Sequence, residues 1–247
     1  MKCLNCGKEL VGFCCTGCGA DLKKDRFRYM MKLDGDRLND ITRYVQKEWG
    51  EAYYNGKGVE QDFEKAAEWY LKAAERGDSF GQCCLGYMYD YGKGVKQDYA
   101  KAVYWYERAA EQGYSLGQNN LGCMYRDGKG VEQDYAKAVE WYEKSAEQGH
   151  SRGQCNMGYM YEIGKGVKQD YAKAVEWYEK SALQGNSCGQ CNLGYMYEHG
   201  KGVEQDDAKA VEWYAKSAEQ GYSRGQNNLG YMYEHGKGVE QDDAKAV

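Results

Sequence analysis

The hydrophobic and polar positions of this chain repeat with a period of 36 residues. The tetrapeptide GKGV begins at positions 56, 92, 128, 164, 200 and 236. A representative unit, residues 79–114, reads SFGQCCLGYMYDYGKGVKQDYAKAVYWYERAAEQGY. A fixed period of this length predicts a solenoid, in which each unit buries its apolar face against its neighbours. The predicted units are 43–78, 79–114, 115–150, 151–186, 187–222 and a partial unit, 223–247.

Each unit is predicted to contain two helices. In the representative unit, the first helix runs from Ser79, taken as its N-cap, to Tyr91, where the GKG motif ends it. The second helix starts at Asp98, another N-cap residue, and ends at Gly113, which suits a left-handed C-terminal position. Helices of this length with short connections form αα-hairpins. The sequence therefore predicts an all-α fold, a right-handed α-solenoid of stacked helix-turn-helix units.

Residues that recur almost unchanged from unit to unit indicate which helix faces are buried. On the first helix they are Gly81, Leu85, Met88 and Tyr89. On the second helix they are Ala102, Val103, Tyr106 and Ala110, with Trp105 as a large apolar anchor. Their spacing places each set on one side of a helix, so both sides are predicted to form the core. Gly81 and Gly86 weaken a helix, and we expect them to allow neighbouring helices to approach closely.

The repeated motif LGYMYDYGKGVKQDYAKAVYWYERAAEQG resembles the Sel-one-like repeat (SLR) family, a relative of the tetratricopeptide solenoids. The resemblance covers residues 43–247. One departure is consistent, because the family usually has Ala where these units carry Gly81 and its equivalents. The first unit is also looser, with Val45 and Trp49 at core positions. The resemblance implies a non-catalytic scaffold that holds partner proteins on its inner surface.

Some columns of the repeat vary while their neighbours stay fixed. The second, fifth, ninth and twelfth columns are predicted to form one stripe of the first helix, opposite the core. In related solenoids the first helices line the concave wall, and Tyr and Arg are common in binding hot spots. The alternative is sequence drift at solvent-exposed positions. The fifth column contains Lys47, Cys83, Asn119, Cys155, Cys191 and Asn227. The candidate partner-contacting residues are Phe80, Tyr87, Asp90, Leu116, Arg126, Arg152, Tyr159, Glu162, Tyr195, Glu198, Arg224 and Tyr231.

Charge is distributed unevenly along the chain. Residues 1–42 carry a net charge of +2, and the rest of the chain carries −7. A mildly acidic solenoid argues against broad nucleic-acid binding, which needs a basic face. No segment resembles a membrane span or a signal peptide, so we expect a cytoplasmic protein, with non-classical secretion left open.

The N-terminal segment, residues 1–22, contains two C-x-x-C motifs. Such paired knuckles bind tetrahedral zinc, and the segment resembles a short zinc ribbon. The predicted ligands of one structural Zn²⁺ are Cys3, Cys6, Cys15 and Cys18. Similar modules usually have the second knuckle directly after Phe, which leaves Cys14 as a substitute for Cys15. Iron or two disulfides are the alternatives.

The other six cysteines are all predicted on first helices: Cys83, Cys84, Cys123, Cys155, Cys188 and Cys191. A cysteine-rich branch of the SLR family joins the two helices of each unit by a disulfide, but no second helix here carries a cysteine. Equivalent positions on stacked helices lie about 8–10 Å apart, too far for an unstrained disulfide. We therefore expect reduced, hydrophobic cysteines. A redox role for the C-x-x-C pair Cys188 and Cys191 is disfavoured, because no βαβ pattern surrounds it.

Residues 23–42 are predicted to be a linker and a capping helix. The favoured function is a monomeric, non-catalytic adaptor that binds proteins or peptides, with no membrane or small-molecule substrate. The alternative is a zinc-ribbon nucleic-acid-binding or regulatory protein with the solenoid as its sensor. An enzyme, such as the β-lactam hydrolase suggested for some relatives, ranks last.

The last unit stops within its second helix. Its missing Trp and Tyr would cover the first helix, so Leu229, Met232 and Tyr233 are expected to be partly exposed. Because natural solenoids end in polar caps, the sequence predicts a fragment, or an end that another molecule covers.

Overall fold

The computed structural model describes residues 10–11, 14–15, 35–242 and 244–246. Strands β1 (Leu10–Val11) and β2 (Cys14–Cys15) pair antiparallel, with Leu10 opposite Cys15. The other elements in the described residues are eleven helices. They are α2 (Gly35–Asn55), α3 (Phe63–Glu75), α4 (Ser79–Tyr91), α5 (Tyr99–Glu111), α6 (Ser115–Asp127), α7 (Tyr135–Glu147), α8 (Ser151–Ile163), α9 (Tyr171–Leu183), α10 (Ser187–His199), α11 (Asp207–Glu219) and α12 (Ser223–His235).

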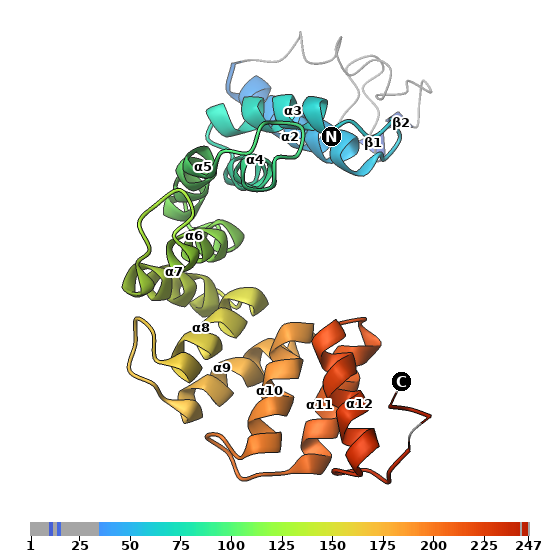
Figure 1. The fold of residues 1–247 in the computed structure, drawn as a ribbon. Helices are drawn as coiled ribbons and strands as arrows, with labels where there is room; N and C mark the ends of the chain where they lie inside the picture. Colours follow the sequence, from blue (N-terminus) through green and yellow to red (C-terminus); the bar gives the residue numbers. More distant parts are fainter. Residues whose placement is uncertain (1–9, 12–13, 16–34, 243, 247) are drawn as a thin grey trace.

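The helices pair into hairpins that stack along a curved array, with α2–α5 at one end and α10–α12 at the other (Figure 1). Each of α4, α6, α8 and α10 packs against the second helix of its own unit and against that of the preceding unit. This arrangement confirms the predicted all-helical repeat solenoid. Helix α2 starts at Gly35 and continues into the first unit, so residues 35–42 belong to that unit's first helix.

Side-chain caps start most of the helices from α3 onward, the exceptions being α6 and α12, which follow Tyr114 and Tyr222. Asp98 caps α5, because its Oδ1 accepts a hydrogen bond from the Lys101 amide at 3.0 Å. The predicted cap of the first helix is wrong by one residue. Asp78, not Ser79, precedes α4 with an extended backbone, and its carboxylate accepts from the Gly81 amide at 2.7 Å. Ser79 is already helical, so it cannot act as the cap.

Glycines end the first helices and set the spacing between units. Gly92 adopts the left-handed conformation, with φ of 65°, directly after α4. A Cβ on Gly94 would overlap the carbonyl group of Phe63 in the preceding unit. A Cβ on Gly86 would lie 2.7 Å from the ring of Tyr106, so the predicted close approach at Gly86 is confirmed. The GKG motif is therefore a contact between units as well as a helix stop.

The core consists of clusters that each join the second helix of one unit to the first helix of the next. One such cluster contains Tyr106 from α5 together with Leu121 and Met124 from α6. The predicted core faces are confirmed for Leu85 and Met88 on α4 and for all four recurring residues of α5. Tyr89 and Trp105 are only partly buried.

The last unit corrects one expectation about exposure. Met232 is fully buried, because it packs against Val211 and Tyr214 of the preceding unit and does not depend on a following helix. Leu229 and Tyr233 are partly exposed, as expected. The equivalent Leu193, inside the array, is 1% exposed.

Candidate functional site

The first helices form the inner wall of the array. Helices α4, α6, α8, α10 and α12 contact one another directly in succession. An asparagine ladder joins them, since an Asn side chain on each helix lies within about 4 Å of a cysteine on the preceding one. These pairs are Asn120–Cys83, Asn156–Cys123, Asn192–Cys155 and Asn228–Cys191. In a curved array, the helices on the concave side approach one another more closely than those on the convex side. The first helices therefore lie on the concave side.

The ladder corrects the prediction for the fifth column. Cys83, Asn119, Cys155 and Cys191 are buried, because this column faces the next first helix. The predicted stripe therefore does not form one exposed face. The second, ninth and twelfth columns stay partly or fully exposed on either side of the buried column.

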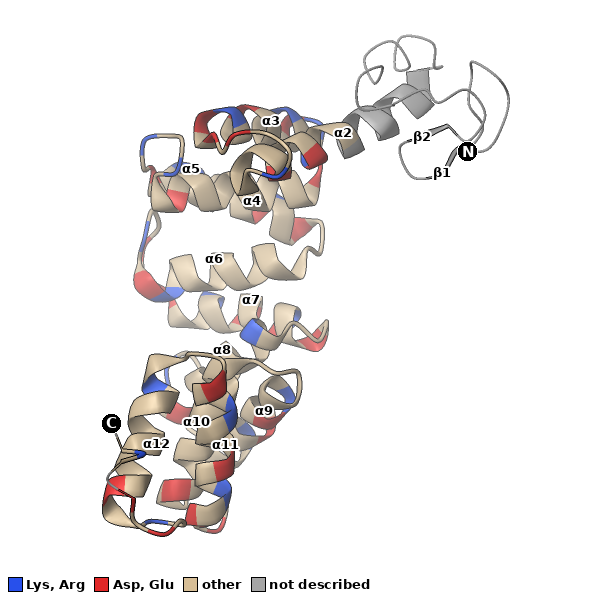
Figure 2. Ribbon diagram, turned by 90° about the vertical axis from the view of Figure 1, so that its right-hand side faces the viewer, with Lys and Arg blue, Asp and Glu red and all other residues tan. Residues whose placement is uncertain are grey.

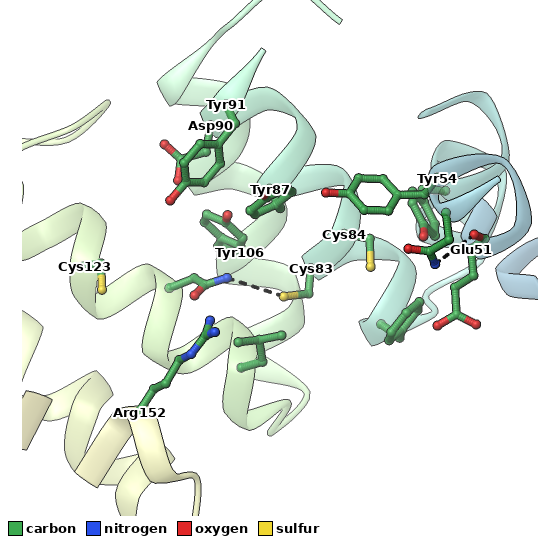
Figure 3. Close-up of a pocket in the computed structure, with 15 residues that line it drawn as sticks. Glu51, Tyr54, Cys83, Cys84, Tyr87, Asp90, Tyr91, Tyr106, Cys123 and Arg152 are labelled. Carbon is green, nitrogen blue, oxygen red and sulfur yellow. Dashed lines mark hydrogen bonds between the residues drawn. The ribbon is translucent and has the colours of Figure 1, made fainter. Parts of the chain in front are cut away.

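The structure brings five of the candidate wall residues into one cavity of about 390 Å³. The cavity lies between α2, α4 and α6, and Arg152 of α8 closes it (Figure 3). Aromatic side chains from α2 and α4 lie on one side and Arg152 points in from the other. The lining residues are Glu51, Tyr54, Asn55, Tyr70, Phe80, Cys83, Cys84, Tyr87, Asp90, Tyr91, Tyr106, Leu116, Asn120, Cys123 and Arg152.

The cavity combines an aromatic surface with a carboxylate that is costly to ionise. Helices α4 and α6 carry few charges, whereas the loops and the second helices carry most of them (Figure 2). Burial raises the pKa of Asp90 above its usual value. Rings of Tyr87 and Tyr91 pack with centroids 4.5 Å apart, and Tyr54 lies edge-on to Tyr87 at 6.3 Å. A large side chain with a positive edge or charge would complement this surface.

The lysine of the GKG motif is a wall residue that the sequence reasoning missed. Lys93 Nζ donates a hydrogen bond to the Tyr54 hydroxyl at 2.9 Å and lies over the ring of Tyr87. The pKa of Tyr87 is lowered by hydrogen bonds with Tyr54 and then with Lys93. Lys201 and Lys237 donate instead to the tyrosine of their own unit that is equivalent to Tyr87, namely Tyr195 and Tyr231 respectively. The sequence feature that could have identified it is the lysine that recurs in every GKG motif, which we interpreted only as a turn.

Two further cavities continue the wall toward α10. One, of about 630 Å³, shares Tyr91, Asn120, Cys123 and Arg152 with the first cavity. The other, of about 540 Å³, contains Arg126 and Tyr159. Arg126 forms an ion pair with the adjacent Asp127 at 2.7 Å. The first cavity and the cavity of about 630 Å³ share four residues and form one groove along the first helices, whereas the third cavity shares only Arg126 with this groove.

The remaining candidates lie on the same wall but have structural partners. Glu162 and Glu198 accept hydrogen bonds from the buried hydroxyls of Tyr178 and Tyr214, at 2.6 and 2.8 Å. Tyr195 packs against two core clusters, and Arg224 lies near Asn192 at 3.5 Å. Together with Tyr231, these residues lie outside the three cavities.

All six cysteines of the solenoid are free thiols. The reduced state agrees with the prediction, but one pair at non-equivalent positions, Cys155 and Cys188, has its sulfurs 3.2 Å apart. That expectation compared only equivalent positions of neighbouring units. Here the fifth column of one unit meets the second column of the next, because the helices stack with an offset.

The histidines have capping roles. His199 and His235 hydrogen-bond the carbonyl groups of Tyr195 and Tyr231, each at 3.0 Å. His150 caps α8, where its Nδ1 accepts from the Gly153 amide at 3.2 Å. Among the described residues, no group of three or more His, Cys, Asp or Glu side chains is arranged to hold a metal ion.

The predicted zinc ligands fall mostly outside the part of the chain that the structure describes. Cys3, Cys6 and Cys18 lie outside the described residues, and Cys15 belongs to strand β2. The β1–β2 pair follows the first C-x-x-C motif in the sequence, and β2 ends at Cys15, the first cysteine of the second motif. None of the helices described has the length and apolar character needed to cross a membrane.

The repeat matches one known family. The family described as Sel1 repeat matches residues 44–78, 79–114, 115–150, 151–186, 189–222 and 223–247. No curated protein sequence matches the chain.

Solved structures give the same result. A Sel1 repeat protein from Oxalobacter formigenes is 32% identical, with a TM-score of 0.79, over 91% of this chain and 90% of that one. A protective antigen of uropathogenic Escherichia coli with an SLR fold is 41% identical, with a TM-score of 0.75. That match covers 92% of this chain but 47% of the antigen, so the chain spans about half of its length. An immunity protein of Pseudomonas aeruginosa, 23% identical over 74% of this chain and 70% of its own, shares the fold at a TM-score of 0.54.

Proposed function

Because the chain belongs to the Sel1 repeat family, whose repeats commonly mediate protein interactions, we propose that it is a non-catalytic adaptor that binds a polypeptide in the groove of its inner wall. The observation that carries this proposal is the cavity between α2, α4 and α6. It gathers Phe80, Tyr87, Asp90, Leu116 and Arg152, which come from three different units.

The shape of the groove favours an extended peptide. Its cavities follow one another along the first helices and share lining residues, so a chain that enters the first can continue into the next. Extended peptides place alternate side chains on one face, which suits a row of separate cavities. The aromatic cavity would hold the anchoring side chain, and the polar cavities would contact the residues that follow.

The chemistry of the first cavity specifies the anchor. Tyr54 and Tyr87 already hold the Lys93 ammonium group over their rings, at 5.3 and 5.2 Å. The buried carboxyl of Asp90 gains from a nearby cation, because burial disfavours its charged form. We therefore propose an aromatic or basic anchor residue in the partner.

A displayed library of random peptides tests this function. The full chain is used to select peptides, and the affinity of the enriched peptide is measured by calorimetry. Tyr87→Ala and Arg152→Ala should each weaken binding by more than about 1 kcal/mol, as expected for hot-spot residues. The matched control is Tyr104→Ala, an aromatic residue of α5 that is 48% exposed and outside the groove. Equal losses in the control and in the groove variants would contradict the proposal.

We also propose that Cys3, Cys6, Cys15 and Cys18 hold one structural zinc ion. The paired C-x-x-C motifs support this, since four cysteine thiolates at such spacings bind tetrahedral zinc. The purified, reduced chain should contain one zinc, which elemental analysis measures. Cys3→Ser with Cys6→Ser should remove it without loss of helical circular dichroism, because solenoid units depend on their neighbours only. Iron, or a metal-free chain, would contradict it.

The nucleic-acid alternative makes a different prediction. If the N-terminal module bound DNA or RNA, the affinity of the full chain for a labelled oligonucleotide would fall steeply with salt. The net charge of −5 argues against such binding, because it repels the phosphates of nucleic acids.

A further inference from the structure

Two cysteines from neighbouring units lie in contact on the inner wall. Cys155 is on α8 and Cys188 is on α10, and their sulfurs are 3.2 Å apart. Cys155 is 4% exposed, whereas Cys188 is partly exposed. A disulfide has a sulfur–sulfur distance of about 2.05 Å, so closing this bond requires a shift of roughly 1 Å.

The surroundings make the two thiols unequal. Cys155 donates a hydrogen bond to the sulfur of Cys188, and the Asn192 amide lies within 3.8 Å of both sulfurs. Cys188 is the second residue of α10, where unpaired backbone amides and the helix dipole favour a negative charge. Cys188 therefore has the environment of a nucleophile and Cys155 that of a proton donor.

Besides Cys155 of α8, the titratable and charged groups around Cys188 are Tyr222, the N-cap residue of α12, Arg224 of α12 and Cys191 of α10. Cys155, Tyr222 and Arg224 stabilise the Cys188 thiolate, and burial opposes its ionisation. The hydrogen bond from Cys155, followed by Tyr222 and Arg224, lowers the pKa of Cys188 to about 6. The pKa of Cys155 is raised, first by its hydrogen bond to Cys188 and then by burial. Near neutral pH, one negative charge is held at Cys188 and Cys155 keeps its proton.

The pair is open to small molecules. Both cysteines line the cavity of about 630 Å³ in the groove. Arg126 and Arg152 also line it, and none of its lining residues in the described part of the chain is Asp or Glu. Arg126 is paired with Asp127, so Arg152 is the charge available to an incoming carboxylate. Although the protein has a net charge of −5, the lining of this cavity is positively charged, so the cavity suits an anionic molecule.

We propose that Cys188 and Cys155 form a reactive dithiol that exchanges with anionic low-molecular-weight disulfides. The Cys188 thiolate attacks one sulfur of the disulfide, whose sulfur–sulfur bond breaks and releases one thiolate. The product is a mixed disulfide at Cys188. Cys155 then gives up its proton to the released thiolate and attacks the Cys188 sulfur, which expels the second thiolate. The two cysteines lose two electrons and Cys155 loses its proton, and the disulfide is reduced to one thiol and one thiolate, which takes up a proton from water.

The product is a covalent link between units 151–186 and 187–222. It joins α8 to α10 inside the groove. In the reduced chain, Asn192 of α10 contacts Cys155 of α8 at the same place. This inference does not depend on the proposed peptide binding, because it requires only the two thiols and their cavity.

The test treats the reduced full chain with oxidised glutathione at pH 6 and identifies the products by peptide mapping. The wild-type chain should form a Cys155–Cys188 link. Cys155→Ser should stop at glutathione bound to Cys188, and Cys188→Ser should give neither product. Cys191→Ser is the matched control, since Cys191 is buried on the same helix and should leave the reaction unchanged. Circular dichroism confirms that each variant is folded.

The rate provides a second readout. At pH 6, Cys188 should react about tenfold faster than an ordinary thiol, because its larger thiolate fraction outweighs its lower nucleophilicity. Arg152→Gln should slow the reaction with oxidised glutathione severalfold but leave the reaction with a neutral disulfide unchanged. A link between other cysteines, no link in the folded wild-type chain, or a rate at Cys188 equal to that of Cys84 would overturn the proposal.

Discussion

The two halves of the inner wall differ although they are built on the same core. In the half formed by α2, α4 and α6, the variable columns carry Tyr54, Phe80 and Leu116, and they open an aromatic cavity. In the half formed by α8, α10 and α12, the corresponding columns carry arginines, cysteines and glutamates. There, Glu162 and Glu198 are bound to the buried tyrosines Tyr178 and Tyr214.

One part of this difference lies in the twelfth column. Asp90 is one methylene shorter than Glu162, and it lines the cavity, whereas Glu162 accepts a hydrogen bond from Tyr178. The units therefore have the same residues at the positions that pack against neighbouring helices, and different residues at positions that do not. The recurring columns hold the array together, and the variable columns decide what each part of the wall can bind.

The largest expected effect tests whether the core is truly shared. Tyr106→Ala and Tyr178→Ala each remove a fully buried ring, so each should lower the free energy of unfolding by about 3–5 kcal/mol. Urea denaturation followed by circular dichroism measures this. A loss below about 1 kcal/mol in one half would show that the two halves do not share one core.

The next effect separates the two halves of the wall. Tyr87→Ala should weaken the binding of a selected peptide by about 2 kcal/mol, because its ring forms part of the aromatic cavity. Tyr159→Ala, whose side chain is 40% exposed, should weaken it by less than about 1 kcal/mol. Calorimetry measures both affinities. A reversed order would place the anchor in the C-terminal half.

Tyr195→Ala extends this comparison to stability. Tyr195 packs against two core clusters, so its loss should lower the melting temperature more than Tyr159→Ala does. Equal melting temperatures would show that Tyr195 is a wall residue only. Thermal denaturation of the two variants, in the absence of peptide, gives the answer.

Removing one hydroxyl group should distinguish the halves again. Tyr178→Phe leaves the carboxylate of Glu162 without the bond of 2.6 Å and should cost about 1.5 kcal/mol of stability. Tyr106→Phe, in the half where the shorter Asp90 lines the cavity, should cost less than about 0.5 kcal/mol. Urea denaturation of both variants measures the difference, and equal costs would contradict this role of Glu162.

The smallest expected effect concerns the cap of α8. His150 accepts a hydrogen bond only when neutral, and burial followed by Arg152 lowers its pKa from the usual 6.5. The unfolded chain therefore binds a proton more readily than the folded one, and stability should rise with pH through this window. The contribution is complete above about pH 6.5 and is lost as the pH falls through the lowered folded pKa.

The next unit supplies the control for this cap. Asn186 occupies the equivalent position before α10 and accepts from the Gly189 amide at 2.9 Å, with no titratable group. His150→Asn should therefore remove the pH dependence at a gain or loss of at most about 1 kcal/mol. Melting temperatures between pH 5 and pH 8 check this. An unchanged pH profile in the variant would assign the dependence to another group.

Much of the fold could be predicted from the sequence because its rules are local. The bounds of α4, the cap Asp98 and the burial of Tyr106 follow from propensities, capping chemistry and helical spacing within one unit. The first-helix cap was misplaced by one residue, since Asp78 and Ser79 are both good caps and only the backbone conformation distinguishes them.

The candidate site could be predicted only in part. The second, ninth and twelfth columns do reach the wall, and five of the candidate residues chosen from them meet in one cavity. The burial of the fifth column and the hydrogen bond from Lys93 to Tyr54 were missed. Both depend on contacts between units, and the sequence of a single unit does not show which residues of neighbouring units come close together.

The sequence by itself determined the period, the two helices of each unit and the faces that form the core, because these depend on residues close together in the chain. Tertiary structure alone decided which columns of neighbouring units meet. The offset between stacked hairpins places Cys188 against Cys155 and Arg152 beside the aromatic cavity. That offset results from packing of all the side chains between two hairpins, so no single motif specifies it.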